Sequence, residues 1–216
     1  MKKNYVLIFA VILLCSAIAF GQKSGLAAKA VADDAAYNEL VAKIKGGDTS
    51  IDFKALRIAF THTKNYSPYG GDRDGQKILF AAIDKKNYKD AVKKAEELLK
   101  DDYVDMDAHV GASLAYRGLG ENDKADIHKN IYLGLVNSII KSGDGKTAST
   151  AYVVISTHEE YITLRALGLA SGDQSLQHLD GHTFDVLTAT DPKTKESLKV
   201  FFNIDISWKA ETEIFK

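Results

Sequence analysis

Two adjacent helix patterns between residues 88 and 119 constrain the fold more than any other feature of the sequence. From Tyr88, small and apolar residues recur at steps of three and four with charged residues between them, which is typical of one buried helix face. After a turn at residues 101–103, Asp105 or Asp107 is a suitable N-cap for a second helix, which Gly120 ends. The buried positions predicted for the two helices are Ala91, Ala95, Leu98, Leu99, Ala108, Ala112, Ala115, Tyr116 and Leu119.

The spacing in this stretch resembles the tetratricopeptide family of helical hairpins. Ala91 and Ala125 lie 34 residues apart, and 34 is the period of that repeat. The resemblance covers roughly one and a half repeats, whereas about three are needed before such an array is stable by itself. Other parts of the chain must therefore complete the hairpins, either as a repeat or as an ordinary antiparallel bundle with alanine-rich contacts.

The N-terminus has the pattern of a secretory signal. Lys2 and Lys3 precede an apolar run over residues 5–20, and Ala19-Phe20-Gly21 is a small-x-small cleavage site. The run is shorter than the roughly 20 residues of a membrane span. We therefore predict a signal peptide over 1–21, a flexible lead-in over 22–32, and a periplasmic or secreted protein that is not integral to a membrane after signal removal.

The only cysteine, Cys15, lies inside the predicted signal. Because Leu14 precedes it, where a lipoprotein signal needs a small residue, the sequence favours cleavage over lipidation. The mature chain then has no disulfide, thiolate nucleophile or zinc–thiolate site. Removing Lys2 and Lys3 leaves 26 of the 28 basic residues against 29 acidic ones, a net charge of −3, so no nucleic-acid partner is indicated.

Residues 33–216 are expected to form a single α+β domain. Its 45% hydrophobic and 26% charged residues are an ordinary balance for one core. A helical part is predicted over 33–145. In addition to the central pair, its helices are predicted to begin at Asp33 or Asp34, at Asp52, and at Asn122 or Asp123. Residues 61–75 lack periodicity and are predicted to be a long loop.

The remaining part, 146–216, is predicted to be mainly β. A continuous β-branched run over 151–156 indicates a strand, and Thr157 with Glu160 matches a capping box for a helix that reaches Gly168. Asp180-Gly181 predicts a tight hairpin, and alternation from Leu198 to Ile206 predicts a further strand. The expected fold class is therefore α+β: a helical, tetratricopeptide-like N-terminal two-thirds followed by a small antiparallel β-meander that carries one helix.

A second resemblance covers most of the mature chain. The residues that carry it are Asp52-Phe53, Leu56-Arg57, Tyr66-Ser67-Pro68-Tyr69, Ser142-Gly143-Asp144-Gly145, Glu159-Glu160-Tyr161, Gln174-Ser175-Leu176, Gly181-His182 and Phe184-Asp185. With these residues the chain resembles an uncharacterised exported bacterial family, a domain of unknown function. The resemblance implies one domain and supplies no catalytic residue.

Several catalytic and metal-binding motifs fail at a named position. Gly145-Lys146-Thr147 resembles the end of a phosphate-binding loop, but Ile140 stands where that motif needs glycine. His158 begins a zinc-protease pattern, but Ile162 replaces its second histidine. Asp72-Arg73-Asp74-Gly75 lacks the first and last ligands of a calcium loop. The acidic residues of the central turn offer only loose calcium ligation, and helix-end carboxylates explain them better. These residues are Asp101, Asp102, Asp105 and Asp107.

One metal hypothesis remains, around the Asp180-Gly181 hairpin. His178 and His182 flank this turn, and Asp185 or Glu159 would complete a three-ligand zinc site for a metal-assisted hydrolase, with Tyr161 or Glu159 assisting. The alternative is that these are ordinary polar residues on the exposed face of a hairpin.

The preferred hypothesis is a non-enzymatic binding or scaffold protein of the cell envelope that needs no cofactor and binds a protein or peptide. Helix pairs with small-residue contacts are a common platform for extended peptides. The candidate contact residues are Tyr66, Tyr69, His109 and Tyr116. For Tyr66 and Tyr69 the alternative is that both rings pack on the helices and anchor the long loop.

Overall fold

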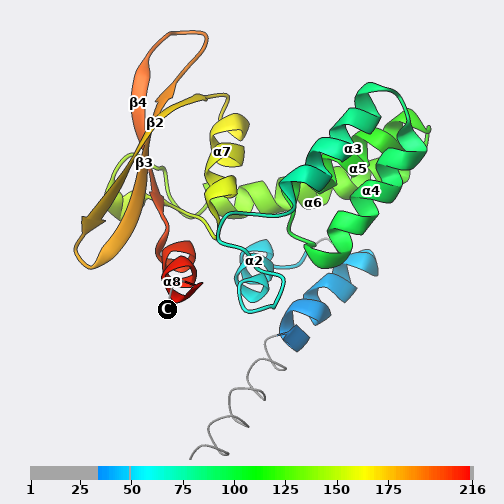
Figure 1. Ribbon diagram of the computed structural model, residues 1–216, viewed down its shortest axis with the longest axis horizontal. Coiled ribbons are helices and arrows are strands. Elements are labelled where there is room, and N and C mark those ends of the chain that lie inside the picture. Colours follow the sequence, from blue (N-terminus) through cyan, green and yellow to red (C-terminus); the bar gives the residue numbers. More distant parts are fainter. Residues whose placement is uncertain (1–33, 49, 215–216) are drawn as a thin grey trace, which may run out of the picture.

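The computed structural model describes residues 34–48 and 50–214 (Figure 1). The predicted signal peptide and lead-in lie outside the described residues. A helix over 34–45 comes first. The later helices are α2 (Phe53–Phe60), α3 (Arg73–Asp84), α4 (Tyr88–Asp101), α5 (Met106–Gly118), α6 (Asn122–Ile140), the 3₁₀ turn η1 (Ala148–Thr150), α7 (Thr157–Ala166) and α8 (Asp205–Ile214). The strands are β1 (Tyr152–Val153), β2 (Ala170–Leu179), β3 (His182–Thr190) and β4 (Ser197–Asn203).

Each of the helices α3 to α6 packs against the next one in the chain, and the four lie together in Figure 1. The predicted central pair is confirmed: Asp105 caps α5 by accepting a hydrogen bond from the Ala108 amide, and Gly120 has a positive φ of 79° beyond its end. The alanines predicted at the contacts are fully buried. α5 also approaches α3 closely, because a methyl group at Gly111 would lie 2.4 Å from Leu79 Cδ2. These contacts suit a repeat and an alanine-rich bundle equally.

The sheet is mixed, with strand order β1-β4-β3-β2. Its β2–β3–β4 portion is the predicted antiparallel meander, with Asp180 at φ 51° in the hairpin turn. The strand predicted over 151–156 is reduced to Tyr152–Val153, and it pairs parallel to β4. The backbone leaves the sheet at Ile155, whose N–H donates to the Glu159 carboxylate and whose carbonyl accepts from the Tyr66 hydroxyl.

Two local predictions in the C-terminal part are wrong. The alternation expected to extend to Ile206 ends at Asn203, because Asp205 opens α8 and turns the chain. Asp205 accepts a hydrogen bond from the Thr183 amide, which fixes this turn against β3. At α7 the N-cap is Ser156 in place of Thr157, and it makes no side-chain capping bond. Consequently Glu159, and not Glu160, reaches back to the preceding backbone.

One continuous core joins the helical part to the sheet, with α7 between them (Figure 1). Ile131, Leu135 and Ile139 of α6 and Leu187 of β3 are all fully buried in it. A smaller cluster of Ala151, Phe184 and Val186 covers the other face of the sheet. Over 34–48 and 50–214, no helix has both the length and the apolar character that crossing a membrane requires.

Candidate functional site

The four predicted contact residues do not meet in one groove. Tyr66 is half-buried, packs edge-on to Phe60 at 6.0 Å between ring centroids, and donates a hydrogen bond to the Ile155 carbonyl. This ring anchors the long loop, as the alternative interpretation expected. Tyr69 is 51% exposed, and its hydroxyl donates to Glu211 Oε1 of α8 at 2.6 Å.

His109 and Tyr116 lie together at a different place, where α4, α5 and α6 meet. His109 is fully buried, and its Nε2 contacts the Tyr103 carbonyl oxygen at 3.0 Å. A carbonyl can only accept, so Nε2 carries the proton and Nδ1 accepts from His128 Nδ1 at 3.0 Å. Tyr116 stacks on His128 and donates to Glu96 at 2.7 Å. His109 is therefore a satisfied core residue with no free nitrogen.

The metal candidates are also separated. His178 pairs with Thr183 and His182 with Leu179, so the two imidazoles lie on opposite faces of the hairpin. His182 Nδ1 contacts Asp205 at 2.6 Å. Asp185 accepts from Gln174, and Glu159 is paired with Arg57. In the part of the chain that the structure describes, no three His, Cys, Asp or Glu side chains are placed to hold a metal ion.

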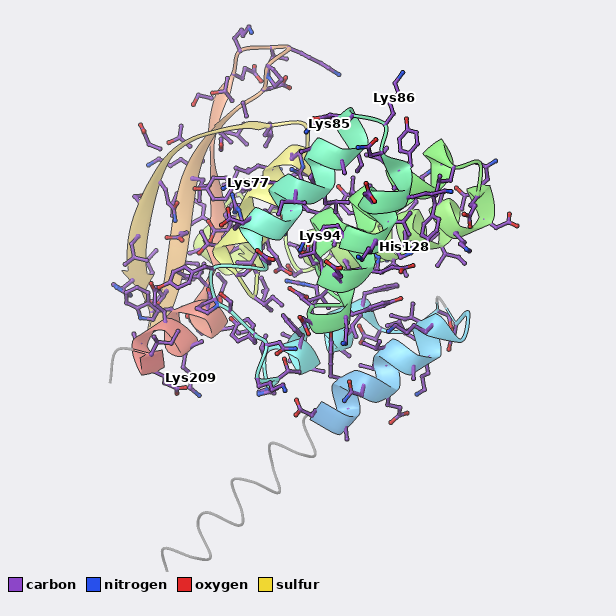
Figure 2. The ribbon with its side chains drawn as sticks, turned by 45° about the vertical axis from the view of Figure 1, so that its right-hand side comes forward. Lys77, Lys85, Lys86, Lys94, His128 and Lys209 are labelled. Carbon is purple, nitrogen blue, oxygen red and sulfur yellow. The ribbon has the colours of Figure 1, made fainter. Side chains whose placement is uncertain are left out.

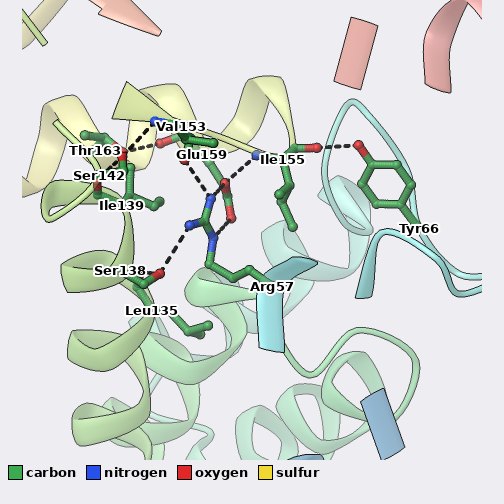
Figure 3. Close-up of polar contacts among 10 residues, drawn as sticks. All are labelled: Arg57, Tyr66, Leu135, Ser138, Ile139, Ser142, Val153, Ile155, Glu159 and Thr163. Atoms are coloured by element: carbon green, nitrogen blue, oxygen red, sulfur yellow. Dashed lines mark hydrogen bonds and ion pairs between the residues drawn. The ribbon is translucent and has the colours of Figure 1, made fainter. Parts of the chain in front are cut away.

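The Arg57–Glu159 ion pair is buried, and Figure 3 shows its polar contacts. The side chains are only 2% and 6% exposed. Arg57 donates from Nε and Nη2 to the two carboxylate oxygens of Glu159, from Nη1 to Ser138 Oγ at 3.2 Å, and from Nη2 to the Val153 carbonyl at 3.1 Å. One guanidinium thereby connects α2, α6, β1 and α7. Four of its five N–H donors are used inside the protein, so the pair is structural.

His158 forms a second connection from α7 to the helical bundle. Its Nδ1 is 2.9 Å from an Arg73 guanidinium nitrogen, which can only donate, so Nδ1 is the acceptor and Nε2–H donates to Asp107 Oδ2 at 2.8 Å. Arg165 donates to the other Asp107 oxygen at 2.6 Å. Burial acts to raise the pKa of Asp107, but the His158 hydrogen bond and the Arg165 charge outweigh it and lower that pKa. With both imidazole nitrogens occupied, His158 is held in place and is not a free base.

An open groove of about 550 Å³ lies beside these connections, between the loop after α2 and the C-terminal half of α4. We call it the acidic groove. Its lining residues are Asn65, Ser67, Gly70, Gly71, Asp72, Lys94, Glu97, Leu98, Asp101, Asp102 and Asp105. Among these described residues the basic one is Lys94 of α4 (Figure 2), whose ammonium is 3.6 Å from Glu97. Carboxylates therefore dominate the charge of the groove.

Asp102 and Asp105 form the floor of the acidic groove at Gly71. A methyl group on Gly71 would lie 3.0 Å from Asp105 Oδ2 and 3.3 Å from Asp102 Oδ2, so both carboxylates flank one point. Asp105 accepts from Gln76 Nε2 and the Ala108 amide, both at 2.9 Å. Asp102 Oδ1 accepts from the Val104 amide at 3.0 Å. Within 34–48 and 50–214, Asp102 Oδ2 receives no hydrogen bond from the protein.

The surroundings disfavour negative charge on this pair. Burial raises the pKa of Asp102 well above its usual range, and the charge of Asp105 adds to the effect, against the hydrogen bond from Val104. Burial also raises the pKa of Asp105, although the hydrogen bonds from Gln76 and Ala108 oppose this. A positive charge placed beside the two carboxylates would be stabilised by both.

A small inner cavity of about 20 Å³ adjoins the acidic groove. Both are lined by Ser67, Gly70, Gly71, Asp102 and Asp105, and the inner cavity also reaches Tyr66, His158 and Glu159. This volume is sufficient for about one water molecule. The N-terminus of α7 is thus close to the groove.

The sequence analysis weighed Asp102 and Asp105 as loose calcium ligands or, preferably, as helix-end carboxylates, with Asp105 as an N-cap. It did not single out Gly71, Gln76 or Asn65. The acidic turn itself was the sequence feature that could have indicated the site. The loop over 61–72, which forms the other side of the groove, could not be foreseen. It contacts the turn through the hydrogen bond from Asn65 Nδ2 to the Asp101 carbonyl, 36 residues away in sequence.

The fold and the groove define an α+β protein with an acidic surface site at a helix–helix turn. The chain belongs to the family described as a domain of unknown function, DUF4919, whose family model matches residues 27–213. This confirms the resemblance to an uncharacterised domain family that the sequence indicated. Comparison with curated proteins and with solved structures gives no significant match.

Proposed function

We propose that this protein is a non-enzymatic binding protein of the cell envelope, and that its acidic groove binds a cationic side chain of a protein or peptide. The observation that carries the proposal is the pair Asp102 and Asp105, whose carboxylates flank one point at Gly71 in surroundings that raise both pKa values. A bound cation would offset the repulsion between them and give Asp102 Oδ2 a donor.

The groove favours a lysine or arginine side chain over other cations. Its volume of about 550 Å³ is within the range of roughly 300–1,000 Å³ for small-ligand sites. Leu98 offers apolar surface for an aliphatic stem, while Asn65 and Ser67 supply polar groups at the rim. The secretory pattern of the N-terminus supports the envelope location.

The alternative of a metal-assisted hydrolase has no comparable support. It needs His178 and His182 on one face of the hairpin, whereas their cross-strand partners place them on opposite faces. The carboxylates proposed to complete it, Asp185 and Glu159, each have another partner.

Calorimetric titration with a designed peptide tests the proposal. The probe carries three arginines in a Gly-Ser background, and its matched control carries citrulline, a neutral isostere, at the same positions. We expect binding of the arginine peptide only, and a loss of about tenfold in affinity, or about 1.4 kcal/mol, in Asp102→Asn. Asp173→Asn, which removes an exposed carboxylate on β2, should bind like the natural protein.

The pH dependence of this binding gives an independent check. Because the pKa of Asp102 is raised in the free protein, a cation that prefers the ionised form displaces a proton as it binds. Affinity should therefore rise with pH through that raised pKa and then level off, and this rise should be smaller in Asp102→Asn. Equal binding of the citrulline peptide, or an unchanged affinity in Asp102→Asn, would contradict the proposal.

A further inference from the structure

Glu160 is a fully buried carboxyl group on the side of α7 that faces the sheet. Its exposed fraction is 0%. Throughout the described ranges, no N–H or O–H group donates a hydrogen bond to either of its carboxyl oxygens. A buried carboxylate without a donor is strongly disfavoured, because it has lost its hydration and gained nothing in exchange. An ionised Glu160 would therefore have no hydrogen-bond donor.

The group that faces it is Asp185 of β3, which is 6% exposed. Asp185 Oδ2 accepts a hydrogen bond from Gln174 Nε2 at 2.6 Å. The orientation of the Gln174 amide is fixed in turn, since its Oε1 accepts from the Tyr161 hydroxyl at 3.1 Å. Asp185 is thus held as an acceptor beside a carboxyl group that has no donor. A single proton held between the two carboxyl groups would give Glu160 and Asp185 a hydrogen bond to each other.

We propose that Glu160 and Asp185 share a single proton in the folded protein, and that this carboxyl pair ties α7 to β3 until alkaline pH removes the proton. The pair is distinct from the acidic groove and does not depend on the function proposed for it. The carboxyl pair binds a proton, and this binding makes the attachment of α7 to the sheet depend on pH.

The charges around the pair act in the same direction. Burial raises the pKa of Glu160 to about 9, and the charges of Asp185 and Glu159 add to the shift. Burial also raises the pKa of Asp185, with a further contribution from Glu211 of α8 and opposing contributions from the hydrogen bonds of Glu160 and Gln174. The charged groups that face the pair from α7, β3 and α8 are thus carboxylates, and β2 contributes a neutral amide.

The sign of the expected pH dependence follows from these shifts. In the unfolded chain Glu160 releases its proton near the ordinary value of 4.5, whereas the folded protein retains it to much higher pH. Between these two values the folded state binds more protons than the unfolded state, so stability falls as pH rises. The contribution of the pair is complete below the unfolded value and is lost as pH passes through the folded one.

Urea unfolding from about pH 6 to about pH 10 tests this, followed by the fluorescence of Trp208, the single tryptophan, which lies on α8. In the natural protein the midpoint should fall steadily with pH. In Glu160→Gln the amide donates to Asp185 without titrating, so its midpoint should exceed that of the natural protein by a margin that grows with pH. Glu213→Gln, which removes an exposed carboxylate from α8, should keep the natural slope.

Infrared spectroscopy gives a readout that does not depend on unfolding. At neutral pH the natural protein should show the carbonyl stretch of a protonated carboxylic acid, and this band should weaken at alkaline pH. The neutral-pH band should be reduced in Glu160→Gln and unchanged in Glu213→Gln. If Glu160→Gln does not fold, the alkaline loss of the band in the double variant Asp102→Asn with Asp105→Asn, in which the carboxyls of the acidic groove cannot contribute, decides the matter. The proposal would be overturned if the urea midpoints of the natural protein and of Glu160→Gln changed with pH in the same way, or if the band were absent at neutral pH.

Discussion

Replacing Arg57 with methionine should lower the free energy of unfolding by about 3–5 kcal/mol, the usual cost of removing one partner from a buried ion pair. The Arg57 and Glu159 side chains are 2% and 6% exposed, so water cannot screen the charge that remains on Glu159. The Ile155 amide would be the hydrogen-bond donor left to that carboxylate. Methionine keeps much of the arginine stem, so the cavity that it leaves is small.

The contacts divide this loss into two parts. The Val153 carbonyl loses the Arg57 donor, which costs about 1–3 kcal/mol where the group is buried. Ser138 Oγ still donates to the Leu135 carbonyl, so its hydroxyl proton remains paired. The rest of the loss comes from the unpaired charge of Glu159. Arg57→Met with Glu159→Gln should therefore be more stable than Arg57→Met alone by about 1–3 kcal/mol, because the amide oxygen is neutral and still serves Ile155.

Urea unfolding measured by Trp208 fluorescence and by far-ultraviolet circular dichroism provides the assay, with coincident curves required for two-state analysis. The matched control is Arg117→Met, which breaks a pair with Asp126 at 2.8 Å whose side chains are 53% and 60% exposed. This control should change stability by less than about 1 kcal/mol. A loss below about 1 kcal/mol for Arg57→Met, or a double variant no more stable than the single one, would refute the argument.

Two further predictions concern the buried histidine and the N-terminus. Burial lowers the pKa of His109 to about 3, so unfolding takes up a proton below the ordinary value of 6.5, and stability should fall as pH decreases from 6.5 toward 3 by about 1.4 kcal/mol per pH unit from this group. His109→Asn should reduce that slope in urea unfolding and the exposed His62→Asn should not; equal slopes would contradict the assignment. Mass spectrometry of the exported protein should find a chain that begins at Gln22, and a chain that begins at Met1 or carries a lipid on Cys15 would be evidence against signal cleavage.

The parts of the fold that sequence predicted are those fixed by neighbouring residues. Asp52 and Asp105 cap α2 and α5 through their own side chains, and Gly120 and the Asp180-Gly181 turn provide positive φ angles. Such signals act within about four residues, so they can be identified without knowledge of the tertiary structure. They account for most of the helical part and for the antiparallel meander, but α3 was not predicted, and the loop predicted over 61–75 was wrong at its end because α3 begins at Arg73.

The failures arose where the local sequence pattern fits more than one backbone structure. The β-branched run over 151–156 favours a strand locally, but Glu159 and the Tyr66 hydroxyl bind both polar groups of Ile155 and end the pairing. Alternation up to Ile206 equally suits the start of α8, since the Trp208 amide donates to the Ile204 carbonyl at 2.8 Å. Periodicity over so few residues does not separate the two structures.

The sequence did not predict the acidic groove as the candidate site, for a related reason. Tyr66, Tyr69 and Tyr116 were chosen as aromatics near helices, but each hydroxyl is occupied by an intramolecular acceptor. The groove instead consists of carboxylates, and its floor depends on Gly71 approaching Asp102 and Asp105. Which acidic residues of a solvated turn acquire raised pKa values is decided by the loop that covers them.

Helix α7 contributes one residue to the cavity beside the acidic groove and another to the buried carboxyl pair. Of its buried residues, Glu159 and Glu160 are carboxyl groups, so polar contacts as well as packing hold this helix in place. Glu159 lines the inner cavity beside the groove, while Glu160, the next residue, faces Asp185 across to the sheet. Because hydrophobic contacts are insensitive to pH, the proton proposed between Glu160 and Asp185 would make the attachment of α7 depend on pH. A shift of α7 moves one wall of the inner cavity, and the groove shares its floor with that cavity.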